Sequence, residues 1–216
     1  MSMRQFSLMD RILEEIDQSL RTVHARPPVT ERPNPARQVA ETVELNSDER
    51  QCSGRLMRVN HAGEVAAQGL YRGQALTARL EGVRTQMQRA ADEENDHLDW
   101  CEQRLQQLGS HKSYLNPVWY WGSFSMGAVA GLAGDRWSLG FVKETEDQVG
   151  RHLEQHLGRL PASDLPSLAI VKQMQEDERR HGDQAQAAGG KRLPWPIRRL
   201  AMPLASKVMT TLSARI

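Results

Sequence analysis

The prediction of the fold begins with DEENDHLDW, residues 92–100, because this stretch places Glu94 and His97 three residues apart. Residues at positions i and i+3 share one face of a helix, so this carboxylate and this imidazole can point at a single metal ion. The plainer interpretation is a solvated helix face that happens to carry a histidine, since most charged side chains face water. The spacing of the other glutamates and histidines separates the two interpretations.

A second Glu-x-x-His pair, Glu178 and His181, occurs in the stretch DERRH. Two such pairs are weak support by themselves, because short motifs also arise by chance. However, Glu64 precedes Glu94 by 30 residues, and Glu146 precedes Glu178 by 32 residues. Both halves of the chain therefore repeat one pattern, in which a Glu is followed at a similar distance by Glu-x-x-His. This repeat favours metal binding over a solvated surface.

Each half of the repeat predicts a helical hairpin, because about thirty residues correspond to one helix, a short turn and part of an antiparallel helix. Packing two such hairpins together gathers four carboxylates and two imidazoles, the ligand set of carboxylate-bridged di-iron bundles of the ferritin-like type. The candidate metal ligands are Glu64, Glu94, His97, Glu146, Glu178 and His181. Among glutamates in similar register, Glu93 and Glu176 lack a histidine three residues later, whereas the spacing does not exclude Glu144.

The chemistry of this ligand set favours iron or manganese, because it is rich in oxygen and supplies one histidine per ion. Two of the carboxylates can bridge two cations about 3.5–4 Å apart, and each ion then takes one terminal carboxylate and one histidine. Four carboxylates also offset the charge of two divalent ions, which permits such a polar cluster inside a bundle. A histidine ligand needs an acceptor on its other nitrogen. Asp96 or Asp177 could fill that role, although a solvated helix face is the favoured interpretation of either residue.

The rest of the sequence predicts helices separated by short breaks. Segments 54–80 and 83–108 are rich in Ala, Leu, Gln, Arg and Glu, which are good helix formers. A further helix is predicted over 136–158, and the next one begins with Ser163 as its N-cap and ends before Gly189. No run of alternating β-branched residues occurs. The predicted fold class is therefore all-α, a ferritin-like four-helix bundle with additional interfacial helices.

Two segments are predicted ahead of the bundle, which itself occupies residues 51–216. Residues 1–24 form an N-terminal amphipathic helix, because apolar residues recur through 6–23 at helical spacing. Residues 25–50 are predicted to be a linker, since the stretch HARPPVTERPNPARQ is rich in proline and poor in apolar residues. We assign no function to either segment.

The composition limits the classes of partner and compartment. Lys and Arg number 28 against 27 Asp and Glu, so no overall field favours nucleic acid as a partner. The two cysteines, Cys52 and Cys101, are too few for a disulfide framework and fit no zinc motif, which indicates a reducing compartment. The N-terminus also lacks the continuous apolar run of a secretory signal.

Two apolar segments indicate contact with a membrane surface. Residues 115–134, LNPVWYWGSFSMGAVAGLAG, carry no charge, but their Gly, Ala, Asn and Pro make them a weak candidate for a span. Trp and Tyr within this segment favour the membrane–water interface. The segment after Trp195 is basic and amphipathic, as interfacial helices are. Its apolar stripe consists of Ile197, Leu200, Leu204, Val208 and Leu212. The alternative is that both segments only pack on the bundle.

Four stretches resemble the demethoxyubiquinone hydroxylase family of ferritin-like di-iron carboxylate proteins, which performs a late ring hydroxylation in ubiquinone synthesis. They are RVNHAGEVAAQGLYRGQ, DEENDHL, ETEDQVGRHLEQHL and QEDERRHGDQA. The resemblance extends from about Arg58 to the C-terminus. It implies that the six candidate ligands fill all the family ligand positions, and it favours Glu146 over Glu144.

The resemblance implies an O2-dependent monooxygenase with two iron ions, which inserts one oxygen atom into the ring of a polyprenyl demethoxy-benzoquinol. No dinucleotide-binding fingerprint is present, so the electrons come from an external electron donor or through the quinol itself. A substrate that resides in the bilayer implies a peripheral membrane protein on the cytoplasmic face of a bacterial inner membrane. Other ubiquinone-biosynthesis proteins are candidate partners.

Three further residues are candidates for a catalytic role. His61 precedes Glu64 by three positions and Tyr71 follows it by seven, so both lie near its helix face. His61 is a candidate for moving protons, and Tyr71 for contact with the ring. His152 is in a family-like position, although six residues from Glu146 it points to another face of the helix. A structural role is the alternative for each.

Two other functions compete with the hydroxylase. The first is a ferritin-like or rubrerythrin-like bundle that stores iron or scavenges peroxide with the same ligands and no organic substrate. The second is a non-enzymatic helical adaptor at the membrane, in which the carboxylates belong to the surface. The Trp-rich apolar segment and the basic amphipathic tail argue against the first.

Overall fold

The computed structural model describes residues 8–25, 32–39 and 44–216, and every regular element within these residues is helical, which confirms the predicted all-α class. The elements are α1 (Leu8–His24), the short 3-10 helix η1 (Pro35–Gln38), α2 (Ser47–Thr77), α3 (Glu81–Gln107), α4 (Asn116–Leu132), α5 (Asp135–Leu157), α6 (Leu165–Ala187), the π-helical turn η2 (Ile197–Ala201) and α7 (Met202–Ser213). The repeat in the sequence thus falls on two hairpins, α2–α3 and α5–α6.

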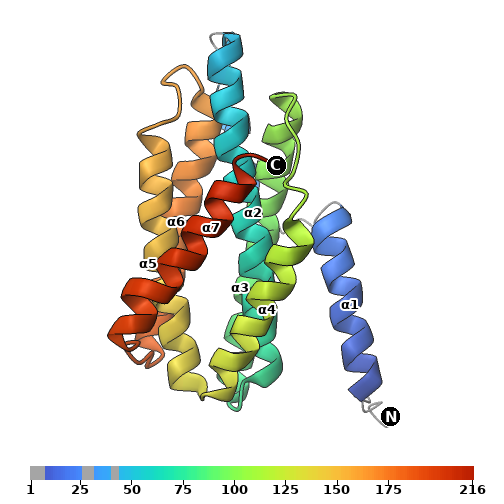
Figure 1. Cartoon of the computed structure of the whole chain (residues 1–216), viewed down its shortest axis with the longest axis vertical. Coiled ribbons are helices and arrows are strands. Elements are labelled where there is room, and N and C mark those ends of the chain that lie inside the picture. Colours follow the sequence, from blue (N-terminus) through green and yellow to red (C-terminus); the bar gives the residue numbers. More distant parts are fainter. Residues whose placement is uncertain (1–7, 26–31, 40–43) are drawn as a thin grey trace.

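The two hairpins pack together as a four-helix bundle of the ferritin-like kind (Figure 1). In such bundles one long connection joins the two helix pairs, and here that connection contains a helix of its own, α4. Figure 1 shows α7 crossing the bundle obliquely and α1 standing beside it. The two hairpins provide the interior where the predicted ligands meet, and the other helices cover its outside.

Local signals explain where two helices begin. α2 starts at Ser47 rather than near residue 54, because Asn46 and Glu49 form a capping box. The Asn46 side chain accepts from the N–H of Glu49 at 2.9 Å, and the Glu49 carboxylate accepts from the N–H of Asn46 at 3.0 Å. Such a cap contributes about 1 kcal/mol. The N-cap of α6 is Asp164 and not Ser163, so that prediction was wrong.

Small residues on α4 allow it to lie directly on α2. A Cβ atom at Gly127 would come within 2.1 Å of the carbonyl oxygen of Leu70, and one at Gly73 within 2.1 Å of that of Phe124. Only glycine permits so close an approach of two backbones. The Gly- and Ala-rich composition of the uncharged segment 115–134 is therefore explained by helix packing.

Two apolar clusters lie along the bundle, and the predicted ligands separate them on every helix of the two hairpins. One cluster includes Leu56, Met57, Trp100, Leu105, Leu153, Ile170 and Met174. The other includes Tyr71, Val83, Met87, Ala91, Val142 and Ala185. On α2, for example, Glu64 lies between Met57 and Tyr71. Each large apolar side chain contributes about 1.5–3 kcal/mol on burial, which offsets the cost of several kcal/mol for each charge buried between them.

The segments outside the bundle have described structure of their own. Within the predicted linker, residues 32–39 include η1, and Asn34 is 5% exposed. The predicted stripe on the last helix faces outward, since its five residues, Ile197, Leu200, Leu204, Val208 and Leu212, are 36–64% exposed. No helix among the described residues is both long and apolar enough to cross a membrane.

Candidate metal centre

The six predicted ligands are buried at the middle of the bundle, on all four of its helices. They are Glu64 on α2, Glu94 and His97 on α3, Glu146 on α5, and Glu178 and His181 on α6. None is more than 4% exposed. Each lies on the inner face of its helix, so the hairpins bring together residues that are far apart in sequence.

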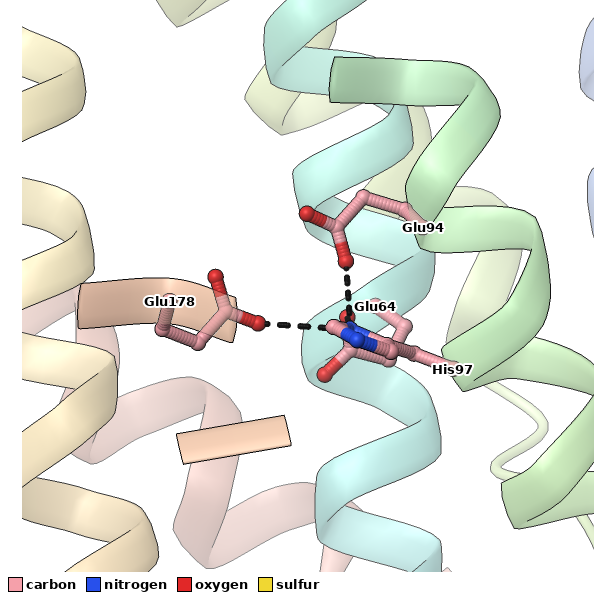
Figure 2. A group of neighbouring side chains, drawn as sticks. All are labelled: Glu64, Glu94, His97 and Glu178. Carbon is pink, nitrogen blue, oxygen red and sulfur yellow. Dashed lines mark ion pairs between the residues drawn. The ribbon is translucent and has the colours of Figure 1, made fainter. Parts of the chain in front are cut away.

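His97 lies at the centre of one half of this cluster (Figure 2). Its Nδ1 atom is 2.8 Å from a carboxylate oxygen of Glu94, and 3.4 Å from oxygens of Glu64 and Glu178. One ligand atom from each of these four residues lies within 4.8 Å of the others, a spacing that suits a single ion. The sequence repeat therefore produces a compact polyhedron of oxygen and nitrogen atoms.

His181 forms the other half with the same two bridging positions. Its Nδ1 atom is 3.3 Å from the second oxygen of Glu94 and 3.6 Å from the second oxygen of Glu178. Glu94 and Glu178 each turn one oxygen to His97 and the other to His181. Two carboxylates between two histidines is the arrangement in which carboxylates bridge a pair of ions.

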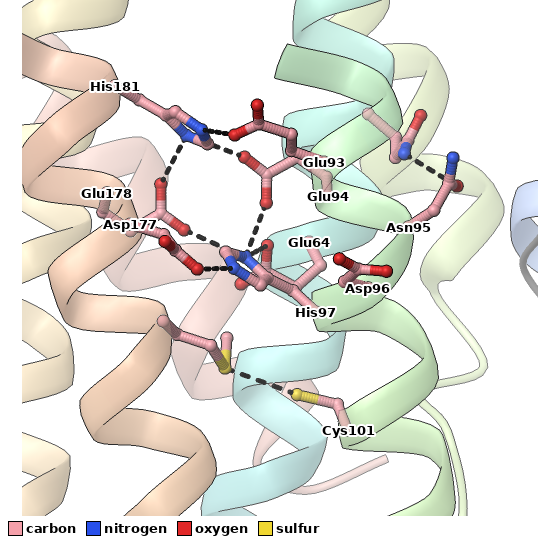
Figure 3. Close-up of polar contacts among 12 residues, drawn as sticks. Glu64, Glu93, Glu94, Asn95, Asp96, His97, Cys101, Asp177, Glu178 and His181 are labelled. Carbon is pink, nitrogen blue, oxygen red and sulfur yellow. Dashed lines mark hydrogen bonds and ion pairs between the residues drawn. The ribbon is translucent and has the colours of Figure 1, made fainter. Parts of the chain in front are cut away.

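Both histidines present Nδ1 to the cluster and Nε2 to a second carboxylate (Figure 3). Nε2 of His97 lies 3.0 Å from Oδ2 of Asp177, and Nε2 of His181 lies 2.8 Å from Oε2 of Glu93. An ionised carboxylate can only accept, so Nε2 carries a proton, and Nδ1 is the nitrogen that can offer a lone pair to a metal ion once the ion displaces the proton there. This is the outer support that metal-ligating histidines have.

The cluster fits a metal pair because several of its buried ligand atoms lack a hydrogen-bond partner within the described structure. Both oxygens of Glu94 and the Nδ1 atoms of His97 and His181 are buried without a well-formed hydrogen bond. An unsatisfied buried polar group costs about 1–3 kcal/mol, and a charged one costs more. Divalent cations among these atoms would satisfy all of them and offset the negative charge. Oxygen-rich sites with one histidine per ion suit iron or manganese.

Electrostatic coupling shows how crowded the cluster is without cations. Burial and the charge of Glu94 raise the pKa of Glu64 well above its ordinary value. Burial and the charge of Glu178 raise the pKa of Glu146 likewise. Although burial opposes it, the carboxylates around His181 raise the pKa of that imidazole to about 12. The metal-free cluster therefore holds protons at neutral pH, and cations binding there would displace them.

Tyr71 and Glu146 complete the inner wall. The Tyr71 hydroxyl donates a hydrogen bond to Oε1 of Glu146, and burial raises the pKa of Tyr71 well above its ordinary value. The phenol therefore stays protonated and orients this carboxylate. Glu144, which the spacing alone did not exclude, lies outside the cluster and accepts from Gln148 at 2.9 Å.

The other two candidate residues lie beside the cluster rather than within it. His61 is 1% exposed, its Nδ1 is 3.4 Å from the amide nitrogen of Asn116, and burial lowers its pKa to about 3. His152 packs against His156 with ring centroids 4.0 Å apart. The buried Nε2 of His152 has no hydrogen-bond partner in the described structure.

A cavity of about 370 Å³ adjoins the cluster. Its walls come mainly from α2, α4, α5 and α7, with Glu178 of α6. Its apolar lining includes Val59, Leu70, Val118, Met126, Phe141, Met202 and Met209. It reaches Glu64, Glu146 and Glu178, and His152 also lines it. The volume lies in the range of small-molecule sites, which are mostly apolar with a few polar groups.

Comparison with known proteins places the chain in a family. Residues 51–213 match the family model described as Ubiquinone biosynthesis protein COQ7. The chain belongs to this family. A 3-demethoxyubiquinol 3-hydroxylase of Nitrosococcus oceani is 59% identical over 207 residues, which cover 96% of each chain. A protein of the same name from Ectopseudomonas mendocina is 54% identical over 100% of this chain and 99% of its own. One from Cupriavidus metallidurans is 55% identical over 96% of this chain and 100% of its own.

In this COQ7-family chain, three residues take part in the contacts around the outside of the cluster, and these roles were not predicted from the sequence. Glu93 supports His181, although the sequence presented it only as a rival ligand. Arg180 lies 2.9 Å from Glu93 and 3.0 Å from Asp177. Arg32 binds Asp96 and Asp177 from outside the matched residues. A signal for Glu93 was present, because an acidic residue directly precedes the glutamate of both Glu-x-x-His motifs.

Proposed function

We propose that this chain is an O2-dependent di-iron 3-demethoxyubiquinol 3-hydroxylase, acting on the ring of a polyprenyl demethoxy-benzoquinol in ubiquinone biosynthesis. The observation that carries the proposal is the apolar cavity that ends on Glu64, Glu146 and Glu178. A site that only stored iron would not need an organic-sized cavity at its ligands. The family match and the names of the relatives support the same reaction.

Two iron ions would be held by the six clustered residues, Glu64, Glu94, His97, Glu146, Glu178 and His181. When bound, they would supply the activation of O2, which no side chain can perform. The chain's own residues keep this pair in place. Asp177 and Glu93 fix the tautomers of the two histidines, and the Tyr71 hydroxyl orients Glu146.

The cavity would hold the quinol ring against the cluster and exclude water. In the reaction a ring C–H bond is replaced by C–OH. One atom of O2 enters the ring, and the other leaves as water after taking up two protons and two electrons, which an external electron donor or the quinol itself supplies. His152 is a candidate to accept a hydrogen bond from a quinol hydroxyl, since burial lowers its pKa and keeps the imidazole neutral. The catalytic roles of His61 and Tyr71 stay predictions of the same kind.

A membrane surface supplies the substrate in this proposal. α7 lines the cavity with Met202 and Met209, while the opposite side of η2 and α7 exposes the apolar stripe that includes Leu200 on η2 and Leu204 on α7. α4 likewise lines the cavity through Val118 and has other exposed apolar side chains. A helix that is apolar toward the membrane and toward the cavity offers a prenyl chain a continuous apolar path.

Membrane attachment is tested by flotation of the full chain with vesicles containing anionic lipid. Replacing Leu200 and Leu204 together by Asp should abolish flotation, because two charges would face the acyl chains. Leu165→Asp, an exposed leucine on α6, is the matched control and should float as the unaltered chain does. Equal flotation of all three proteins would contradict attachment through α7.

The hydroxylase itself is tested with iron-loaded protein, a demethoxyubiquinol analogue, a reductant and isotopically labelled O2. Mass spectrometry of the extracted quinone should show one labelled oxygen gained. Glu178→Ala should yield no product, whereas Glu176→Ala, an exposed carboxylate two residues away, should retain activity. Iron turnover with peroxide and no labelled product would favour the storage or scavenging alternative, which the family match does not favour.

A further inference from the structure

Arg32 brings the N-terminal part of the chain into contact with the outer side of the metal cluster. It lies just before η1, in the stretch predicted to be a linker and outside the residues matched by the family. Its Nε atom is 2.6 Å from Oδ2 of Asp96, and its Nη1 atom is 2.7 Å from Oδ2 of Asp177. Its Nη2 atom donates to the backbone carbonyl of Glu93 at 3.3 Å.

One oxygen atom connects this arginine to a predicted metal ligand. Oδ2 of Asp177 accepts from Arg32 and also lies 3.0 Å from Nε2 of His97. Trp100 adds a second connection, because the Arg32 guanidinium lies 5.2 Å from its ring centroid and the His97 ring lies 5.3 Å from it. Arg32 and His97 therefore share both a carboxylate and an aromatic ring.

The chain around Arg32 is itself fixed on the bundle. The Asn34 side chain accepts from the N–H of Ala36 and donates to Gln103 on α3 at 3.1 Å. Arg32 is 31% exposed, whereas Asp96 and Asp177 are at most 3% exposed. Charge-assisted hydrogen bonds between a planar guanidinium and buried carboxylates are strong and directional. The arginine therefore restrains the orientation of Asp177 from outside the bundle.

We propose that Arg32 is a positioning residue for the metal centre, which acts through Asp177 to hold the His97 ring with Nδ1 toward the cluster. The inference rests on the metal site of the proposed function, but not on the hydroxylation. The outer carboxylate sets the direction and basicity of a histidine ligand, and its loss typically lowers metal affinity by 10–100-fold. A group that holds this carboxylate in place therefore also affects the affinity of the site for metal.

A purely structural tether is the competing explanation, and the chain contains a matched control for it. Arg72 on α2 pairs with Glu15 of α1 at 2.9 Å, so it also joins the N-terminal part to the bundle. It is less exposed than Arg32, at 19% against 31%. Its carboxylate partner is not in contact with either cluster histidine.

The experiment titrates metal-free, full-length protein with Fe²⁺ under anaerobic conditions against a competing chelator, and with Co²⁺ as a spectroscopic probe. Arg32→Ala should weaken the ion at His97 by about 10-fold and change the Co²⁺ absorption bands. Arg32→Lys keeps the charge but cannot bond two carboxylates as a fork, and should lose less. Arg72→Ala should bind metal within about twofold of the unaltered protein.

A double-mutant cycle separates positioning from tethering. If Arg32 acts through Asp177, then Arg32→Ala should change affinity by less than about twofold in an Asp177→Asn background. Equal effects of Arg32→Ala and Arg72→Ala, or an undiminished effect of Arg32→Ala in that background, would overturn the proposal. Should Arg32→Ala fail to fold, Arg32→Lys gives the same comparison. The titration contains no quinol and no O2. It therefore tests the role of Arg32 in metal binding independently of whether the protein hydroxylates the quinol.

Discussion

The two histidines of the cluster share two inner carboxylates but have different outer partners. Each presents Nδ1 to Glu94 and Glu178, as the repeated sequence motif requires. The outer partner of His97 is Asp177, whose side chain is 3% exposed, whereas that of His181 is Glu93, whose side chain is 24% exposed. The half of the cluster around His97 is therefore closed, and the half around His181 is nearer to solvent.

The outer supports also cross between the hairpins. Asp177 precedes the motif of α6 and supports the histidine of α3, while Glu93 precedes the motif of α3 and supports the histidine of α6. Arg180 contacts both outer carboxylates, Glu93 and Asp177. Arg32 contacts the side chain of Asp177 but not that of Glu93. Internal repetition thus specifies the inner ligands equally, whereas a contact from outside the repeat makes the two halves unequal.

The largest expected effect is the loss of metal from both halves of the cluster at once. Glu178→Ala should lose both iron ions, because its two oxygens face different histidines and a bridging ligand serves both ions. His97→Ala and His181→Ala should each lose one ion preferentially. Metal analysis after reconstitution measures iron per chain, and circular dichroism checks the helical content. Retention of two irons in Glu178→Ala would remove the bridging assignment.

A second comparison measures the inequality of the outer supports. Asp177→Asn should lower iron affinity by 10–100-fold, because a buried support cannot be replaced by water. Glu93→Gln should lower it less, since water can reach that position and bond to His181. Chelator competition gives both values under identical conditions. Equal losses would show that burial of the outer carboxylate does not distinguish the two halves.

The inner site could be predicted from sequence because it depends on local spacing. The i, i+3 positions of Glu94 and His97 fix one face of one helix, and the second copy fixes another. The alignment of the two hairpins then leaves little freedom for Glu64 and Glu146. The wrong N-cap at Ser163 and the missed start of α2 concern helix ends, where side-chain hydrogen bonds and not periodicity decide the boundary.

The outer contacts could not be predicted in the same way, because they depend on packing between distant segments. Arg32 lies 64 residues before Asp96 and 145 before Asp177, in a proline-rich stretch with no hydrophobic period. Likewise, the small residues of α4 argue from sequence only against a membrane span, whereas in the folded chain contact with α2 requires them. For Glu93 and Asp177 the paired acidic residues gave a signal, but the crossing between hairpins becomes visible only in the folded chain.

The smallest expected effect concerns the stability of the metal-free protein in acid. Hydrogen bonding to His181 lowers the pKa of Glu93 from an ordinary value of 4.5 to about 2. The folded state therefore resists protonation, so this pair stabilises the protein above pH 4.5 and the contribution is lost as the pH falls toward 2. His61 has a pKa of about 3 and adds a loss below its ordinary value of 6.5 in every variant.

Glu93→Gln should consequently lose less unfolding free energy than the unaltered metal-free protein between pH 5 and pH 3. The difference should be below about 1 kcal/mol, the range of partly exposed ion pairs. Urea denaturation at the two pH values measures it. Asp177→Asn should show a smaller difference over this range, because the pKa of Asp177 falls to about 2 from an ordinary value of only 3.8, so its unfolded form takes up fewer protons between pH 5 and pH 3. If Glu93→Gln lost as much unfolding free energy as the unaltered protein, the contact of Glu93 with His181 would contribute nothing to stability, and the half around His181 would lack a formed outer support.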